Sequence, residues 1–476
     1  MGDLSNVISG ERVSALSGAT LANTDPATNT EIGRIPRSAA ADVDAAVSAA
    51  KAALAGPWGR TTAEERAALL DRIADGIEAR LDDFARAESR DTGKPLWLAR
   101  KVDIPRAVAN FRFFAGAVRH DETGSQRTGS AINYTVRKPL GVVALITPWN
   151  LPLYLLSWKT APALAMGNTV VAKPSEMTPS TATMMAELMV EVGLPPGVFN
   201  VIHGLGPEAG GPLVGHEDVA AVSFTGGTAT GRIVARTAAP MFKKLSLELG
   251  GKNATIVFDD CDLERTLDGV VRAAFLNQGQ ICLCGSRLLV QRSIYDRFVP
   301  AFIEKVRALK VGPPAEPDSF LGALVSEAHR DKVEGYVRLA REEGGTIACG
   351  GDRPDLPGAF LRPAVVTGLT TDARTACEEI FGPVVTVHPF DDEEDAIRMA
   401  NSVQYGLAAS VWTENLRRAH TVSERLDTGM VWVNCWLLRD LRVPFGGVKD
   451  SGVGREGGHH SLEFFSDAQN ICIQLG

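Results

Sequence analysis

The segment Phe275-Leu-Asn-Gln-Gly-Gln-Ile-Cys-Leu-Cys-Gly-Ser-Arg287 places one cysteine in a setting that favours reactivity. Cys282 follows a polar, glycine-containing turn and precedes the apolar run Leu288–Val290, which predicts a strand. A free thiol has a pKa of about 8.5 and reacts as its thiolate, so it needs help to become a nucleophile. Backbone N–H groups exposed in a turn can give that help and can also stabilise an oxyanion. A buried structural cysteine is the alternative, because free cysteine is among the most buried residue types.

A second candidate residue, Glu248, lies upstream in the segment Leu245-Ser-Leu-Glu-Leu-Gly-Gly-Lys-Asn253. An unpaired buried charge is unfavourable, so a glutamate between leucines must find a partner, take up a proton or face a cavity. Together, Glu248 and Cys282 favour a catalytic site over a structural cysteine.

Several ordered motifs resemble those of the aldehyde dehydrogenase superfamily, and the resemblance extends over nearly all 476 residues. The motifs are Pro148-Trp-Asn-Leu-Pro152, Lys173-Pro-Ser-Glu176, Phe224-Thr-Gly-Gly-Thr-Ala-Thr-Gly231, Glu248-Leu-Gly-Gly-Lys-Asn253, Gly279-Gln-Ile-Cys282, Glu378-Glu-Ile-Phe-Gly-Pro383 and Pro444-Phe-Gly-Gly447. One such motif would be weak support, whereas the ordered set is specific.

The apolar pattern after Pro139 predicts a largely parallel sheet with helices on its faces. Short apolar runs alternate with helix-like segments at Gly141–Ile146, Thr169–Ala172, Phe199–Ile202 and Ala220–Phe224. Ala254–Phe258 begins a second such series. The resemblance implies the α/β aldehyde dehydrogenase fold with three parts. These are a Rossmann-like cofactor domain (1–120 and 139–248), a second α/β catalytic domain (249–445) and a small β oligomerisation arm (121–138 and 459–476).

The sequence of the N-terminal part is typical of helices, and the alanine-rich segment Ala40–Ala55 predicts the first of them. Thr62 and Glu65 have the spacing of a capping box at the start of the next helix. Its apolar positions recur every three or four residues and predict one buried stripe that ends at Asp91-Thr-Gly-Lys94. These positions are Leu69, Ile73, Ile77, Leu81 and Phe84.

The segment Phe224–Gly231 follows a predicted strand and opens a predicted helix, which is the setting for phosphate binding at a helix N-terminus. It does not match the usual Gly-x-Gly-x-x-Gly fingerprint, and a Gly-Gly turn can also be a plain connection. The resemblance implies NAD as the cofactor, with Gly226 and Gly227 along the pyrophosphate. Many relatives have serine in place of Gly227, so one hydroxyl contact to phosphate is absent here.

Lys173 and Glu176 follow a predicted strand, at the edge where open α/β sheets bind ligands. They could be solvated loop residues, but the resemblance implies that they bind the adenosine ribose. A carboxylate there repels a 2′-phosphate, so Glu176 favours NAD over NADP. The resemblance further assigns four residues to the cofactor site. Among them, Glu379 binds the nicotinamide ribose and Phe381 packs near it. The alternative for Phe381 is an aromatic residue of the core without a role in binding. The four residues are Ile146, Trp149, Glu379 and Phe381.

The resemblance also assigns the catalytic roles. Cys282 attacks the aldehyde carbon, and the Asn150 side chain and the Cys282 backbone N–H stabilise the oxyanion. After hydride transfer, Glu248 acts as general base for the water that hydrolyses the thioester. Cys284, two residues beyond the nucleophile, is interpreted as structural or redox-sensitive.

Three segments resemble the 2-aminomuconate and 2-hydroxymuconate semialdehyde dehydrogenases: Asp103–Arg106, Asn434–Arg442 and Gly454–Gly458. Arg106 and Arg439 align with positions that are apolar tunnel walls in many relatives. A guanidinium binds a carboxylate bidentately, so they predict a carboxylate-bearing aldehyde, with Arg442 and Phe445 as further substrate-binding candidates. The alternative is that an arginine pairs with a protein acid such as Asp103 or Asp440. Nothing in the sequence separates the amino substrate from the hydroxy substrate.

The composition is that of an ordinary globular protein, with 45% hydrophobic and 22% charged residues. A net charge of −8 provides no general basic surface for nucleic acid. Seven cysteines without paired spacing predict a reducing compartment, and no apolar stretch reaches the roughly 20 residues of a membrane span. The chain also lacks a His/Cys cluster for a metal. We therefore expect a cytoplasmic homodimer or homotetramer with a small-molecule aldehyde substrate, no metal, and no nucleic-acid or membrane partner.

Three rival functions remain open on the sequence. The enzyme could oxidise another aldehyde, of the betaine or aliphatic type, if the arginines point away from the tunnel. A non-redox thioester hydrolase or acyltransferase could use the same three groups, Cys282, Glu248 and Asn150. A non-catalytic protein that keeps the fold would need none of the three.

Overall fold

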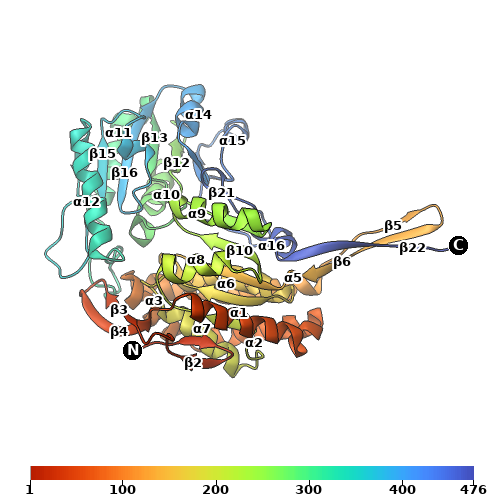
Figure 1. The fold of residues 1–476 in the computed structure, drawn as a ribbon. Coiled ribbons are helices and arrows are strands. Elements are labelled where there is room, and N and C mark those ends of the chain that lie inside the picture. The colour runs from red at the N-terminus through yellow and green to blue at the C-terminus, as the bar shows by residue number, and fades with distance from the viewer. Residues whose placement is uncertain (1) are drawn as a thin grey trace.

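The computed structural model of the protein describes residues 2–476, and two large sheets form its body (Figure 1). The first sheet has the strand order β2-β1-β9-β8-β7-β10-β11-β21. Its strands are β1 (Asn6–Ile8), β2 (Glu11–Val13), β7 (Val142–Ile146), β8 (Thr169–Lys173), β9 (Phe199–Val201), β10 (Val219–Thr225), β11 (Lys244–Glu248) and β21 (Gly452–Val453). The five central strands, β9-β8-β7-β10-β11, are parallel to one another, as the apolar sequence segments predict.

Helices cover both faces of this sheet because consecutive residues of its central strands are apolar and point to opposite faces. Val143 and Leu145 of β7 pack with four helices: α2 (Ala63–Ala79), α5 (Ile104–Arg119), α6 (Pro152–Ala165) and α7 (Ser180–Glu191). Val142 and Ala144 face the other way, toward α1 (Ala40–Ala55), α8 (Gly211–Gly215) and α9 (Thr228–Ala238). Helix α6 is buried along its whole length.

The second sheet has the order β14-β15-β16-β13-β12-β18-β19, and all pairs except β14–β15 are parallel. Its strands are β12 (Ala254–Val257), β13 (Arg287–Gln291), β14 (Thr346–Cys349), β15 (Ala364–Thr367), β16 (Val384–Phe390), β18 (Ala408–Trp412) and β19 (Met430–Val433). Helices α10 (Leu263–Phe275) and α11 (Arg292–Arg307) pack on one face, and α14 (Glu393–Asn401) and α15 (Leu416–Glu424) on the other. Helix α12 (Glu327–Glu342) packs near β15, and the short helix α13 spans Arg374–Cys377.

A three-stranded sheet projects from the body in Figure 1. Strand β6 (Ala131–Pro139) lies between β5 (Ser125–Thr128) and β22 (Ser466–Gln474), so segments from the middle and the end of the chain form one arm. Helix α16 (Gly458–Phe464) precedes β22. Two small antiparallel pairs complete the strands, β3 (Thr20–Asp25) with β4 (Thr30–Pro36) and β17 (Tyr405–Gly406) with β20 (Val448–Lys449). The domain boundaries expected from the sequence, with the cofactor domain ending at 248 and the catalytic domain at 445, stay a prediction.

The prediction of one helix from Thr62 to Asp91 is wrong. The predicted capping box forms, with Thr62 and Glu65 bonded to each other's backbone N–H groups. Helix α2 ends at Ala79, however, and α3 (Leu81–Thr92) starts after Arg80, whose backbone leaves the helical region at φ −112° and ψ 24°. The apolar stripe continues across the break because both helices bury that face, so periodicity alone does not reveal it.

Candidate active site

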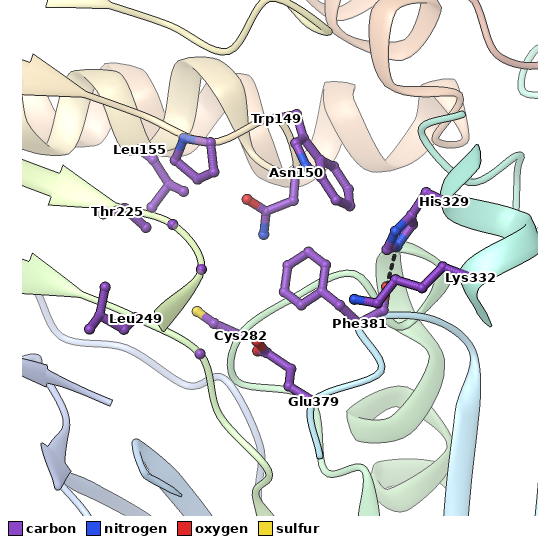
Figure 2. A pocket seen from close by; sticks show the side chains of 14 residues that line it. Trp149, Asn150, Leu155, Thr225, Leu249, Cys282, His329, Lys332, Glu379 and Phe381 are labelled. Carbon is purple, nitrogen blue, oxygen red and sulfur yellow. Dashed lines mark hydrogen bonds between the residues drawn. The ribbon is translucent and has the colours of Figure 1, made fainter. Parts of the chain in front are cut away.

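The candidate site lies where the two sheets meet, beyond the carboxyl ends of β7, β8, β10 and β11. A cavity of about 240 Å³ there is lined by Asn150, Cys282, Glu379 and Phe381, among others. Figure 2 shows the Cys282 thiol and the Asn150 amide projecting into the same space. A parallel sheet brings its ligand-binding loops together at this edge, which is why motifs far apart in sequence converge.

Cys282 lies on the loop between a 3₁₀ turn (Leu276–Gly279) and β13. Its carbonyl oxygen accepts a hydrogen bond from Asn253 Nδ2 at 2.7 Å. A Cβ on Gly251 would come within 2.7 Å of the same oxygen, so the second glycine of the Gly-Gly pair is needed for this approach. Burial raises the pKa of the Cys282 thiol, and the nearby Glu248 carboxylate raises it further. Burial therefore favours the neutral thiol over the thiolate at Cys282.

Asn150 is buried, and its Nδ2 donates to the Gln280 carbonyl oxygen at 2.8 Å. Gln280 precedes Cys282 by two residues, so this bond ties the amide to the loop that carries Cys282. The Asn150 side-chain oxygen has no hydrogen-bond partner in residues 2–476.

Glu248 ends β11 and is buried, and neither carboxylate oxygen has a hydrogen-bond partner in the described chain. Burial raises its pKa well above the usual range, and the Glu456 carboxylate adds to the shift. The carboxylate does not line the 240 Å³ cavity itself. It faces Gly446, where a Cβ would stand 2.8 Å from Glu248 Oε1.

The sequence motifs did not predict the buried polar cluster of Lys159, Ser223 and Glu456 near Glu248. Lys159 of α6 donates to Glu456 Oε1 at 2.6 Å and to Ser223 Oγ at 2.8 Å. A lysine inside the apolar segment Pro152–Ala165 is the sequence signal that points to such a pair. Its charge partly offsets the effect of Glu456 on the Glu248 carboxylate.

A second cavity, of about 450 Å³, contains the residues predicted to bind the adenosine and pyrophosphate parts of the cofactor. Ile146, Trp149, Lys173 and Glu176 line it, together with Gly226 and Gly227 at the start of α9. Lys173 Nζ lies 3.5 Å from Glu176 Oε2. A Cβ on Gly227 would meet nothing within 4 Å, so the backbone there is open to a ligand.

Glu379 and Phe381 line the first cavity. Glu379 Oε1 accepts the Gly251 N–H at 2.9 Å, and a Cβ on Gly250 would stand 2.3 Å from Glu379 Oε2. The Phe381 ring meets Trp149 edge-on, with ring centroids 5.2 Å apart. His329 and Lys332 of α12 also line this cavity (Figure 2) and were missed, because a His and a Lys on a charged amphipathic helix carry no motif.

A third cavity, of about 30 Å³, also borders Cys282, and Tyr154, Arg439 and Phe445 line it. The Arg439 guanidinium lies over the Phe445 ring at 4.1 Å and donates to Tyr154 Oη at 3.2 Å, while its Nη2 is buried without a partner. Arg106 lies over the Tyr154 ring at 5.5 Å. Burial lowers the pKa of Arg106, and the Arg439 charge lowers it further.

Neither Arg106 nor Arg439 forms an ion pair with a carboxylate in residues 2–476. The two acids considered as alternatives have other partners: Asp103 pairs with Lys94 and Asp440 with Arg442. The structure does not bring Arg442 to this cavity, because its side chain is 79% exposed and bound to Asp440. Arg439, which lines this cavity, and Arg106, which lies over the Tyr154 ring, are therefore half-buried cations without a carboxylate partner in residues 2–476.

Fold and site together are those of an α/β enzyme with a buried thiol beside one cavity and a second cavity at the edge of an open parallel sheet. The aldehyde dehydrogenase family model matches residues 13–471, so the chain belongs to the aldehyde dehydrogenase family. It is 54% identical to a 2-aminomuconic 6-semialdehyde dehydrogenase of a Pseudomonas species, over 91% of this chain and 90% of that one. It is 49% identical over the full length of both chains to a 2-hydroxymuconic semialdehyde dehydrogenase of Pseudomonas sp. strain CF600. An aldehyde dehydrogenase from Bacillus cereus, solved as an NAD⁺ complex, superposes with a TM-score of 0.98 at 40% identity, covering 100% and 97% of the two chains.

These matches confirm the predicted family and fold class, and they make the protein an aldehyde-oxidising enzyme. They argue against a non-catalytic protein that merely keeps the fold. Within residues 2–476, every helix is too short or too polar to span a bilayer.

Proposed function

We propose that the protein is an NAD-dependent dehydrogenase that oxidises a carboxylate-bearing semialdehyde, of the 2-aminomuconate or 2-hydroxymuconate type, to the acid. The observation that carries the proposal is the pair of half-buried guanidinium groups, Arg106 and Arg439, beside Tyr154 without carboxylate partners. A buried cation without a counter-ion is unfavourable, so its presence at a substrate cavity favours an anionic ligand. The names of the two Pseudomonas relatives support the same substrate class.

The chain's own groups divide the reaction among them. The Cys282 thiol releases its proton to solvent water, and Sγ then forms a bond to the aldehyde carbon while the C=O π electrons move to the carbonyl oxygen. Asn150 Nδ2 and the Cys282 N–H are the donors for that oxygen. When bound, NAD supplies the acceptor for the aldehyde hydride. Glu248 then takes a proton from water as the water attacks the thioester carbon, and the C–S bond breaks to release the acid.

The residues that line the two cavities suit NAD. Lys173 and Glu176 would hold the adenosine ribose, and Gly226 and Gly227, at the N-terminus of α9, would approach the pyrophosphate. Glu379, held by the Gly251 N–H, would bind the second ribose. The Bacillus cereus neighbour with NAD⁺ supports this cofactor.

The direct test is NADH formation by the purified protein. The substrates are 2-hydroxymuconate semialdehyde, generated in situ, and an uncharged aliphatic aldehyde of similar length. We expect NADH from both and a kcat/KM that is much higher for the semialdehyde. Equal kcat/KM values would contradict the substrate proposal and leave a general aldehyde dehydrogenase. No NADH from any aldehyde, with thioester hydrolysis retained, would favour the non-redox alternative.

We also propose that the protein is a cytoplasmic homodimer or homotetramer assembled through the arm of β5, β6 and β22. Within residues 2–476, strand β22 is paired only with β6. Ile473, near its end, is 46% exposed, and Leu475, just beyond it, is 52% exposed. An exposed apolar strand edge favours pairing with another chain. All seven cysteines are free thiols, which supports a reducing compartment. Sedimentation velocity should show a dimer or tetramer, and a monomer would contradict the assembly proposal.

A further inference from the structure

We propose that Lys94 is a positioning residue for aldehyde oxidation, which fixes Asn150 by binding its main-chain carbonyl oxygen. The inference rests on the proposed function, because it assumes that the Asn150 side chain stabilises the oxyanion. Lys94 itself acts through Asn150 and reaches no reacting atom.

The Lys94 ammonium is completely buried in a cluster of two carboxylates and one carbonyl group. Its Nζ lies 2.6 Å from Asp103 Oδ2, 2.9 Å from the Asn150 carbonyl oxygen and 4.0 Å from Glu88 Oε1. Burying an ion pair is rarely the most stable choice, because apolar residues of similar volume are often neutral or stabilising there. The cluster is therefore better explained by the geometry it imposes than by stability.

The loop that carries Asn150 has no regular secondary structure between β7 and α6. Two side chains hold its carbonyl group: Lys94 Nζ at 2.9 Å and Asn277 Nδ2 at 3.2 Å. Asn277 belongs to the turn before Cys282 and has a left-handed backbone, with φ at +53°. The Asn150 amide in turn donates to Gln280 of that same loop. Main chain and side chain of Asn150 are thus both fixed relative to the nucleophile.

The two carboxylates anchor Lys94 to the surrounding helices. Asp103 ends a π-helical turn, Ala99–Asp103, and such turns often mark functional positions. Glu88 of α3 accepts from Thr181 Oγ1 at 2.9 Å and from the Leu153 N–H, at the start of α6, at 3.4 Å. Burial raises the pKa of Glu88 to about 7 and also raises the pKa of Asp103. Through these bonds the cluster links helices α3, α6 and α7 to the loop of Asn150.

The test asks whether Lys94 acts through Asn150 or only supports the fold. Lys94→Met is made in the wild-type protein and in Asn150→Ala, and kcat/KM is measured with an uncharged aldehyde, so the result does not depend on the semialdehyde assignment. Lys252→Met is the matched control, because Lys252 is equally buried and donates to a main-chain carbonyl, that of Thr375 at 2.8 Å, away from Asn150. Asn277→Ala, which removes the other donor to Asn150, is a second test variant if Lys94→Met does not fold.

Misplacement of an oxyanion donor by about 1 Å can lower a rate about 100-fold. We therefore expect Lys94→Met to lower kcat/KM about 10- to 100-fold in the wild-type background and less than about threefold in Asn150→Ala. The Cys282 alkylation rate with iodoacetamide, which develops no oxyanion, should stay within about threefold of wild type. The effect of Lys252→Met should be the same in both backgrounds.

Equal losses from Lys94→Met in both backgrounds, or no loss in either, would overturn the inference and leave a structural lysine. An Asn150→Ala variant with wild-type kcat/KM would overturn it as well, together with the oxyanion role of Asn150. Failure of the proposed function is distinguishable, because the wild-type protein itself would then form no NADH.

Discussion

Replacement of Arg439 by methionine tests the substrate proposal most directly. No protein carboxylate pairs with Arg439 in residues 2–476, so the substitution leaves no buried acid without its partner. What is lost in the free enzyme is the hydrogen bond to Tyr154 Oη and the contacts with the rings of Phe445, at 4.1 Å, and Trp158, at 5.1 Å. Each cation–π contact contributes about 0.5–1 kcal/mol at a partly exposed site, and the methionine side chain restores part of the packing. The fold should therefore tolerate the change.

The effect on catalysis should be larger and confined to charged substrates. A hydrogen bond to a charged group contributes about 1.5–3 kcal/mol. Because Arg439 is only half-buried and Arg106 remains, we expect the lower part of that range, about 2 kcal/mol. At about 1.4 kcal/mol per factor of ten, this corresponds to a loss of roughly 30-fold in kcat/KM for the semialdehyde. The uncharged aldehyde should keep its kcat/KM within about threefold.

The assay is steady-state NADH formation with both aldehydes, for the wild type, Arg439→Met and a control. Arg418→Met is a suitable control, since Arg418 also lies over an aromatic ring, Phe258 at 4.5 Å, but stands apart from the cavities around Cys282. It should leave the preference for the semialdehyde unchanged. Equal losses for both aldehydes in Arg439→Met would refute the reasoning, because they would show a packing role, or an effect of the Arg439 charge on Glu248 and Cys282, instead of carboxylate recognition.

Four further predictions concern the other groups of the site. Glu248→Gln should retain a rapid burst of about one NADH per site and then turn over about 100- to 10,000-fold more slowly, as seen by stopped flow, because only thioester hydrolysis needs the base; loss of the burst would contradict that role. Burial and the Glu456 charge raise the pKa of Glu248, and a general base acts only when it is unprotonated, so kcat should rise with pH. Glu456→Gln should move that rise to lower pH. An unchanged pH profile of kcat would count against Glu248 as the base. Glu176→Gln should increase kcat/KM with NADP about tenfold or more, because the repulsion of the 2′-phosphate is removed; an unchanged ratio of NADPH to NADH formation would speak against Glu176 as the selectivity residue. Gly446→Ala should displace the Glu248 carboxylate, which lies 2.8 Å from the added Cβ, and lower kcat at least tenfold. Its Tm should fall as well, because Gly446 has φ +151° and the added Cβ also lies 2.8 Å from the Gly454 carbonyl oxygen; wild-type kcat would show that the carboxylate moves aside freely.

The amino-acid sequence was sufficient for the features that depend on neighbouring residues. The capping box of Thr62 and Glu65 and the strands from β7 to β10 follow from short-range periodicity and polarity. The motifs around Cys282, Glu248 and Asn150 predict the family, which the match over residues 13–471 confirms. Even so, the break at Arg80 was not predictable, because the same apolar stripe continues on both sides of it.

The tertiary structure was needed wherever a role depends on which distant side chains meet. The sequence does not distinguish the roles of Arg106, Arg439 and Arg442. In the structure, Arg106 and Arg439 lie beside Tyr154 without a carboxylate partner, whereas Arg442 is exposed and bound to Asp440. The partners Lys94 and Asn150, and likewise Lys159 and Glu456, lie far apart in the chain and leave no local pattern. Secondary structure responds to the nearest few residues, whereas a buried charge takes its partner from whatever segment the packing of whole helices and sheets brings within hydrogen-bonding distance.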